Sequence, residues 1–420
     1  LLLSGVSWAS DFKFDGEVEQ DIDYYHDNEI FRGHTNLNLE ISKEYGFDKK
    51  LYFNPEFNLN YDENTDIDNL ELDSNLKEGY FDLYLNKYDI RIGKQLVNWG
   101  SAFKINPSSV VNPIDYTVED LDETRLAVNA VKGKYYHDFN TIVSGVISDF
   151  KASPIPDNIL ITKKKQINQG IKTKLTRQLS TQLPEDEAQQ QADYLVNNFL
   201  SYKTVEPEID NIQDVEFTLQ LTQRNWKGFD LSLNYFNGYE DRPSLDSNLA
   251  KIMESLVQEK PATVNFGYKE TQSFGIDVIG SIKELGVWCE TNFSYNEDEE
   301  KKLDTVIGGD YTCENNLYTV AQYFHRSYKD YENDRNDLDY VMLQNKKPFR
   351  QIHEWKITTV YDIDNNSYIV NPEMNFSLLN NLSLNIGTLI TDDQDQNNSS
   401  NSLISMMGNE KSYASISYNF

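Results

Sequence analysis

The stretch "VEFTLQLTQ", residues 215–223, alternates apolar and polar side chains at successive positions. Its apolar residues run from Val215 to Leu221, with Glu, Thr and Gln between them. Successive side chains of a β-strand point to opposite faces, so this pattern predicts a strand with one apolar and one polar face. The segment "LYFNPEFNLNY", residues 51–61, repeats it, and similar segments recur along the chain. We therefore expect an all-β protein.

The lengths of these segments and the turns between them predict a membrane barrel. Segments of about ten residues match a tilted strand that crosses a bilayer. Tight polar turns alternate with long, often acidic loops, as in barrels with short periplasmic turns and long extracellular loops. A soluble sandwich would alternate too, but would not require this order of turns. Counting back from the C-terminus predicts a transmembrane antiparallel β-barrel of about 18 strands, or about 16 if the weak segment 340–347 is not a strand.

The two ends of the chain indicate export. Residues 1–9, LLLSGVSWA, resemble the end of a signal peptide, with a short buried element as the alternative. Residues 10–420 are then expected to form one barrel domain. The ending "SYASISYNF" resembles the C-terminal assembly signal of bacterial outer-membrane barrels, carried by Ala414, Ile416, Tyr418 and Phe420. We expect location in the bacterial outer membrane, with its lipid and the barrel-assembly machinery as partners.

Two loops, expected outside the cell at residues 151–214 and 237–271, carry the helical periodicity of the sequence. In the first loop, apolar residues recur every four positions from Ile167 to Leu179, and a second apolar face follows Pro184. The pattern predicts a helical hairpin here and one further helix in the other loop. The helices could form either a packed surface cap or a lid over the pore.

A lysine interrupts the strand at the start of "IRIGKQLVNWGSAFKINPSSVVNP", residues 90–113. If Ile92 faces lipid, strict alternation sends Lys94 outward as well, at a cost of roughly 2 to 4 kcal/mol near the bilayer midplane. Glycine adopts positive φ without strain and allows a bulge that shifts the alternation by one residue. We therefore expect a bulge at Gly93 that turns Lys94 into the lumen.

The next expected strand has the same anomaly, because Lys132 and Lys134 flank Gly133. Pairing the two strands across their loop puts Lys94 opposite Lys132, where like charges require neutralisation. The expected pore and substrate residues are the basic ones of this region: Arg91, Lys94, Lys104, Arg125, Lys132 and Lys134. They form either a lumen wall neutralised by carboxylates or an anion-selective constriction.

The loop after the first of these strands has two interpretations. Trp99 falls where the strand leaves the membrane, a position typical of an interfacial aromatic girdle. Alternatively the loop folds inward and narrows the pore, stiffened by two Asn-Pro pairs. The candidate pore-loop residues are Trp99, Gly100, Asn106, Pro107, Asn112 and Pro113.

These residues also resemble a known family. Gly93, Lys94 and Gln95, followed by Trp99-Gly100 and Asn112-Pro113, resemble the G-R-Q…W-G…N-P stretch of a broad group of bacterial outer-membrane barrels akin to alginate-export porins. Lysine replaces the usual arginine, which keeps the charge and loses the bidentate fork. The resemblance implies a barrel and a channel. Alginate-type members export an anionic polysaccharide, and other members accompany the transport of lipid or hydrophobic substrates.

Composition and motifs exclude several classes. A formal charge of −30 disfavours nucleic acid as a partner. The five histidines form no H-E-x-x-H pair and no G-x-S-x-G occurs, so no enzyme is predicted. No cofactor is expected, except that acidic loops 62–68 and 392–396 could bind calcium; solvated loops are the alternative. Cys289 and Cys313 could form a disulfide or fill strand positions as small apolar residues.

The sequence thus predicts an outer-membrane channel that moves a polar or anionic solute or polymer past a basic lumen patch. The alternative is an outer-membrane component of a lipid or lipoprotein transport pathway that works with periplasmic and inner-membrane partners. Conductance of the purified barrel distinguishes the channel from a blocked barrel that carries lipid.

Overall fold

The computed structural model describes residues 12–27, 29–62, 72–118, 121, 123–207, 215–298, 300–329, 335–392 and 410–420. Eighteen strands form one antiparallel sheet, in which β1 pairs with β21 and closes a barrel. The strands are β1 (Lys13–Tyr25), β2 (Ile30–Tyr45), β3 (Lys49–Asp62), β4 (Leu72–Tyr84), β5 (Tyr88–Gln95), β6 (Val128–Tyr136), β7 (Thr141–Ser148), β9 (Glu216–Trp226), β10 (Phe229–Tyr239), β13 (Glu270–Ile282), β14 (Leu285–Asn296), β15 (Lys301–Thr312), β16 (Tyr318–Lys329), β17 (Arg335–Phe349), β18 (His353–Asp362), β19 (Ser367–Leu379), β20 (Leu382–Asp392) and β21 (Lys411–Asn419). The expected all-β barrel of about 18 strands is confirmed.

The outer surface of the barrel is apolar and the inner surface is polar. In β9, Phe217 and Leu219 expose 40% and 41% of their surface, whereas Thr218 between them is buried. A bilayer offers no water to unpaired backbone groups, so strands cross it only as a closed sheet with an apolar outer face. The protein is therefore an outer-membrane β-barrel.

The last strand closes the barrel beside the first. Gly16 and Phe420 exchange two backbone hydrogen bonds, at 3.0 and 2.9 Å between N and O. Ile416 and Tyr418 expose nearly half of their surface on the outside of β21. The final stretch therefore forms the seam strand, and its recognition by the assembly machinery stays a prediction.

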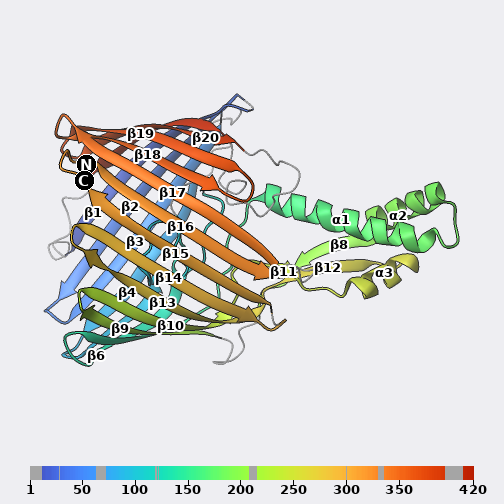
Figure 1. Cartoon of the computed structure of the whole chain (residues 1–420), viewed down its shortest axis with the longest axis horizontal. Helices are drawn as coiled ribbons and strands as arrows, with labels where there is room; N and C mark the ends of the chain where they lie inside the picture. Colours follow the sequence, from blue (N-terminus) through green and yellow to red (C-terminus); the bar gives the residue numbers. More distant parts are fainter. Residues whose placement is uncertain are drawn as a thin grey trace, which may run out of the picture.

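The two ends of the barrel differ in loop length. Both chain termini lie at one end (Figure 1), where two-residue turns such as 227–228 and 283–284 join successive strands. At the other end β5 and β6 are separated by residues 96–127, and β7 and β9 by residues 149–215. Short turns mark the periplasmic end, so the long loops are extracellular.

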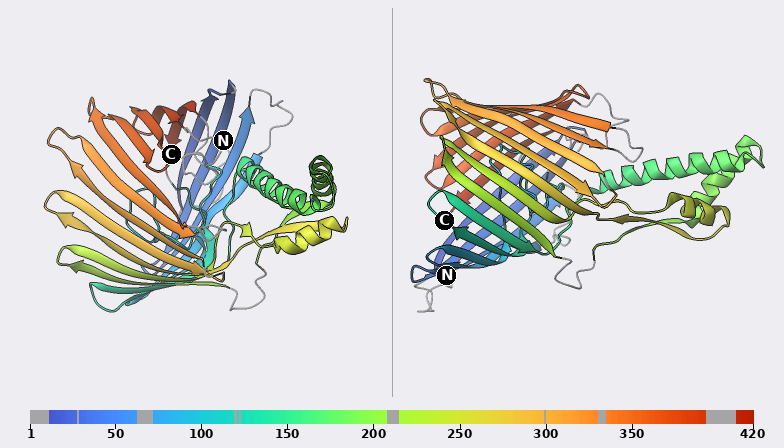
Figure 2. Two further views of the ribbon diagram at one scale, coloured as in Figure 1. Left: turned by 45° about the vertical axis from the view of Figure 1, so that its right-hand side comes forward. Right: turned by 60° about the horizontal axis from the view of Figure 1, so that its bottom comes forward.

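Two extracellular loops build an arm, defined by residues 157–204 and 244–267. Its helices are α1 (Asp157–Leu179), α2 (Glu185–Phe199) and α3 (Leu249–Val257), and its short strands are β8 (Leu200–Thr204), β11 (Ser244–Leu245) and β12 (Ala262–Gly267). Leu175, Leu195 and Leu256 meet in a core of the arm's own. The arm projects away from the barrel (Figures 1 and 2), so its helices do not lie flat across the mouth as a lid would. In the described part of the chain, each helix is too short or too polar to span a membrane.

The two cysteines are free. The register of β14 with β15 places Ile307 opposite Cys289, and Cys313 follows the last residue of β15. Of the two alternatives for these cysteines, the structure shows the unbridged one.

The register of β5 corrects the expected bulge. β5 pairs with β4 and β6 without a shift, although Gly93 has a φ of 131°. Lys94 therefore lies opposite Asn129, and the expected pairing with Lys132 is wrong. Lys94 keeps the outward parity of Ile92, one residue before the extracellular end of β5. The penalty for a lysine falls to about 0 to 1 kcal/mol near the interface, so the argument from the bilayer midplane does not apply there.

Gly93 should be intolerant of any side chain, and Gly133 supplies a matched control. A Cβ on Gly93 would lie 2.3 Å from the carbonyl oxygen of Gly79, whereas a Cβ on Gly133 would meet nothing within 4 Å. We expect Gly93→Ala to cost roughly 1 to 3 kcal/mol, because it combines a steric clash with a positive φ. The temperature at which the folded band disappears in gel electrophoresis measures this loss. Equal unfolding temperatures for Gly93→Ala and Gly133→Ala would contradict it.

Candidate functional site

The loop between β5 and β6, residues 96–127, folds into the barrel and is called the inner loop below. Its Phe103 amide donates to Oε1 of Gln322 in β16 at 2.9 Å. Its Ser101 hydroxyl donates to Oδ1 of Asp277 in β13 at 2.5 Å. These strands lie across the lumen from β5, so the inner loop crosses the lumen and narrows it.

The inner loop packs on the wall from which it starts. Val97, Trp99 and Val111 form a buried cluster with Val128 and Ala130 of β6. Only 5% of the Trp99 surface is exposed, so Trp99 belongs to this internal cluster and the interpretation as a girdle residue is wrong. The apolar residues at the start of β6 face the lumen because the loop covers them. Lys132 and Lys134 lie an even number of residues after Val128 and Ala130 in the same strand. Both therefore face the lumen without a bulge.

Glu290 of β14 anchors the inner loop to the far wall. Its Oε1 accepts from the amides of Ser101 and Ala102, and its Oε2 accepts from the amide of Ser108 at 3.2 Å. The Glu290 side chain is fully buried. Gly100 adopts a φ of 95°, and a Cβ there would lie 2.7 Å from Oε1 of Glu290. The close approach of loop and carboxylate thus requires glycine at this position.

Asn112 joins the two ends of the inner loop. Its Oδ1 accepts from the amide of Val97 at 2.6 Å, and its Nδ2 donates to the carbonyls of Gln95 and Leu126. The side chain is buried, and both its oxygen and its nitrogen form hydrogen bonds. The second Asn-Pro pair of the sequence therefore holds the loop closed on itself, and the carbonyl of Pro113 accepts a hydrogen bond from the amide of Leu126 at 2.9 Å.

Arg125 binds the inner loop from within. Its guanidinium donates to the carbonyls of Asn106, Ser109 and Asn112 and pairs with Glu123 at 2.5 Å. Burial raises the pKa of the Glu123 carboxyl, and the positive charge of Arg125 opposes this shift. Arg125 thus has a structural task in addition to its charge.

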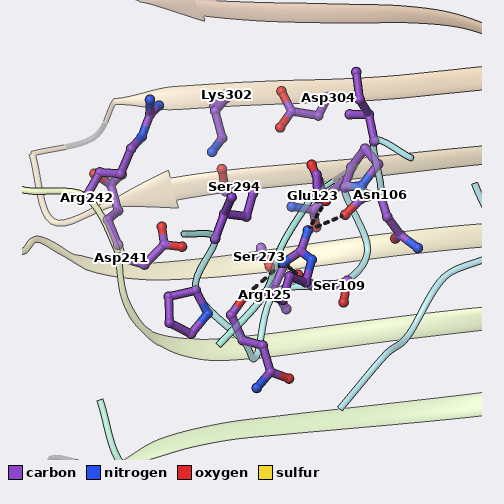
Figure 3. A pocket seen from close by; sticks show the side chains of 18 of the residues that line it. Asn106, Ser109, Glu123, Arg125, Asp241, Arg242, Ser273, Ser294, Lys302 and Asp304 are labelled. Carbon is purple, nitrogen blue, oxygen red and sulfur yellow. Dashed lines mark hydrogen bonds and ion pairs between the residues drawn. The ribbon is translucent and has the colours of Figure 1, made fainter. Parts of the chain in front are cut away.

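A cavity of about 420 Å³ lies between the inner loop and the barrel wall, and is called the main cavity below. Figure 3 shows Arg125 and Asn106 of the loop facing Lys302 and Asp304 of β15. The charged lining includes Glu123, Arg125, Lys151, Asp241, Arg242, Lys302, Asp304 and Arg326; the loop residues Asn106, Pro107, Asn112 and Pro113 line it as well. Arg326 is neutralised by Asp304 through two hydrogen bonds of 2.7 and 2.8 Å.

Four cations that line the main cavity have no ion pair with a carboxylate among the described residues, namely Lys151, Arg242, Lys301 and Lys302. Arg242 stacks over the ring of Tyr116 at 5.4 Å. Burial raises the pKa of the Tyr116 hydroxyl, which keeps this ring neutral. Arg242 and Lys302 therefore bring positive charge into a lining that also holds the carboxylates of Asp241 and Asp304.

The basic residues expected to form one patch are dispersed. Arg91 is paired with Asp82 at 2.7 Å and lies opposite Lys132 on the lumen wall. Lys94 bonds to Asn75 and Leu76 at the edge of the barrel, and Lys104 has a φ of 60° and lies 5.5 Å from the ring of Phe103. Arg125 is the one residue of the six that lines the main cavity.

The sequence matches a family model over residues 5–360, described as "Protein of unknown function (DUF1302)". The chain belongs to the DUF1302 family. No curated protein matches the chain. The family match leaves the resemblance to alginate-export porins as a prediction.

Solved structures share the fold of this DUF1302 barrel. The OccK5 (OpdH) protein of Pseudomonas aeruginosa is 8% identical, covers 98% of this chain and 97% of its own, and has a TM-score of 0.55. The outer membrane protein OpdK of the same organism is 8% identical, with coverages of 98% and 99% and a TM-score of 0.53. OccAB3 of Acinetobacter baumannii is 8% identical, with coverages of 98% and 98% and a TM-score of 0.51. At such identity the likeness shows the outer-membrane barrel fold.

In the DUF1302 barrel, three wall residues bind the inner loop, and no sequence pattern distinguishes them. Glu290, Asp277 and Gln322 occupy polar positions of alternating strands, like many other lumen residues. Their roles depend on which loop reaches them, and alternation carries no information about that. Metal binding at the acidic loops 62–68 and 392–396 stays a prediction, because these loops lie almost wholly outside the described residues. Within the described residues, no cluster of three His, Cys, Asp or Glu could hold a metal ion.

The Glu290 anchor of the DUF1302 barrel is tested by amide hydrogen exchange. Glu290→Ala removes the acceptor of three loop amides, and a hydrogen bond to a charged group contributes about 1.5 to 3 kcal/mol. We expect exchange of the peptide around residues 101–108 to accelerate at least about tenfold. Asp82→Asn, which breaks a wall ion pair away from this anchor, is the control. Unchanged protection in Glu290→Ala would show that the carboxylate does not hold the loop.

Proposed function

We propose that the protein is an outer-membrane channel for small polar solutes, with a preference for solutes that carry negative charge. The observation behind the proposal is the inner loop, which narrows the lumen and leaves a charged cavity beside the far wall. A narrow, charged constriction selects solutes by size and by charge. Arg242 and Lys302 supply the attraction for anions, since neighbouring carboxylates neutralise Arg125 and Arg326.

The fold similarity to the Occ structures supports this proposal without supplying the solute. The proposal assigns no catalytic step to the barrel. The proposal also assigns the attraction of anions to Arg242 and Lys302, and no longer to the basic patch that was expected from the sequence. Lys132 and Lys134 lie on the lumen wall and extend the positive potential along the route of the solute.

Charge reversal at the two cations tests the anion preference. We expect Arg242→Glu combined with Lys302→Glu to reduce the chloride-to-potassium permeability ratio roughly two- to fivefold, because two attractive charges become repulsive at the constriction. The reversal potential in a planar bilayer under a KCl gradient measures this ratio. Lys172→Glu makes the same kind of change on the arm and should leave the ratio unaltered. An identical ratio in all three proteins would refute the selectivity claim.

Acidification should strengthen the anion preference through Glu123. The raised pKa of Glu123 means that its carboxylate gains a proton at a higher pH than an exposed glutamate does. Protonation leaves the charge of Arg125 uncompensated, so the permeability ratio should increase as the pH falls from about 7 to about 5. Glu123→Gln should have the higher ratio already at neutral pH and lose this part of the pH dependence. If the variant and the native protein titrate identically, Glu123 does not control the charge of the constriction.

A further inference from the structure

The hydrogen-bonded ladder between β19 and β20 is interrupted. The register of these described strands runs from Tyr368 to Val370 and resumes at Glu373, omitting Asn371 and Pro372. Proline has no N–H to donate and is unfavourable inside a sheet. On its other side, Pro372 is paired with Ile357 of β18 in an unbroken register. The missing ladder bonds are therefore those that would join β19 to β20.

A side-chain contact bridges the interruption from the lumen side. Tyr413 of β21 and Asn371 of β19 exchange two hydrogen bonds, at 3.0 and 3.1 Å, across β20. The residue of β20 opposite Tyr413 is Gly387, and a Cβ there would lie 2.4 Å from Cζ of the tyrosine ring. The ring of Tyr413 thus occupies the space that a side chain at position 387 would fill. The Tyr413–Asn371 contact is called the latch below.

Cavities lie on both sides of the latch. On the lumen side a cavity of about 920 Å³ is lined by Asn371, Glu373 and Tyr413. On the outer side a groove of about 880 Å³ is lined by Pro372, Glu373 and Tyr413, together with lipid-facing residues such as Ile22, Met374 and Ile386. Glu373 and Tyr413 belong to both linings. The latch therefore lies between the lumen cavity and a groove that opens on the bilayer.

We propose that the latch is a lateral gate through which a single-chain amphiphile passes between the lumen and the outer membrane. The groove accepts the hydrocarbon tail, because its outer part is apolar and continuous with the surface that contacts acyl chains. The head group stays in the lumen cavity until the latch opens. This route is separate from the main cavity and does not depend on the proposed channel.

The lumen cavity indicates the charge of the head group. Its lining contains Asp21, Asp23, Asp62, Asp73 and Glu373 against Arg32 and Lys411. Lys411 pairs with Asp23 at 3.0 Å, and Glu373 pairs with Lys356 at 2.6 Å. Negative charge remains in excess, so a cationic head group is favoured over an anionic one. The ligand class is therefore a long-chain amine or a similar cationic amphiphile.

A reducible crosslink across the latch tests the gate. In a background with Cys289→Ser and Cys313→Ser, the pair Asn371→Cys and Tyr413→Cys removes the latch and allows a bifunctional thiol reagent to replace it. The two positions lie two strands apart, about 10 Å at ordinary strand spacing. We measure uptake of a fluorescent long-chain alkylamine into the outer membrane of cells, with cells that lack the protein as the baseline for direct partition. The alkylsulfonate of equal length tests the charge preference.

We expect the reduced pair to take up the alkylamine faster than the native protein does. Crosslinking should reduce uptake to the baseline, and reduction should restore it. Pro372→Val, which supplies an N–H toward β20, should also slow uptake. The pair Asn234→Cys and Asn292→Cys is the matched control, since it spans Gly275 in an unbroken register of β10, β13 and β14. Crosslinking that control should leave uptake unchanged.

Uptake that is the same in the crosslinked and the reduced latch pair would overturn the lateral gate. Faster uptake of the alkylsulfonate would overturn the cationic preference. Planar-bilayer conductance of the crosslinked protein separates this proposal from the channel. Ion conductance that persists while alkylamine uptake is lost assigns the two routes to different parts of the barrel. Absent conductance with gated uptake would refute the channel alone.

Discussion

Inside a bilayer every backbone N–H and C=O requires a hydrogen-bond partner within the protein, and the architecture follows from this constraint. Closure of β1 on β21 leaves the barrel without a sheet edge in the membrane. The same constraint makes Pro372 informative, because a residue without an N–H stands where a ladder bond would form. The side chains of Tyr413 and Asn371 bridge this place with two hydrogen bonds of their own.

The closed sheet alone would leave a wide lumen, and the inner loop divides it. Three backbone amides of the loop converge on the carboxylate of Glu290, and Phe103, Ile105 and Leu121 pack on an apolar cluster of the far wall. The loop is therefore held to the far wall by polar and apolar contacts, and a cavity remains beside it. Beside the loop lies the main cavity, with Arg242 and Lys302 in its lining. Val118 and Leu121 of the loop line both this cavity and the acidic lumen cavity. The loop thus contributes to the lining of both cavities.

The sequence was sufficient for the barrel because one face of each strand must meet lipid. Alternation at residues 215–223 predicted β9, and parity of the strand count required the weak segment at 340–347, which lies in β17. The helices of the arm fall inside the ranges expected for them, 151–214 and 237–271. The short strand β12 was missed, since its pairing with β8 joins two loops far apart in sequence.

Sequence reasoning failed where one part of the chain covers another. Val128 and Ala130 look like lipid-facing residues, but the inner loop buries them on the lumen side. That inversion made Lys132 and Lys134 look anomalous, although both face the lumen in an unbroken strand. The alternation of apolar residues indicates that one face of a strand is covered. It does not indicate whether lipid or another part of the chain covers that face. The Asn-Pro pairs and Trp99 did indicate an unusual loop. The contacts of this loop with β13 and β16 show that it folds inward.

The passage of the inner loop across the lumen is the central claim, and a cysteine pair tests it most directly. Ser101 and Asp277 are joined by a hydrogen bond of 2.5 Å, so Ser101→Cys with Asp277→Cys places two thiols within reach of each other. In a background without Cys289 and Cys313, mild oxidation of intact outer membranes should form this disulfide and leave the folded barrel unchanged. Free thiols after oxidation of the folded barrel would show that the loop does not reach the far wall, and would contradict the account.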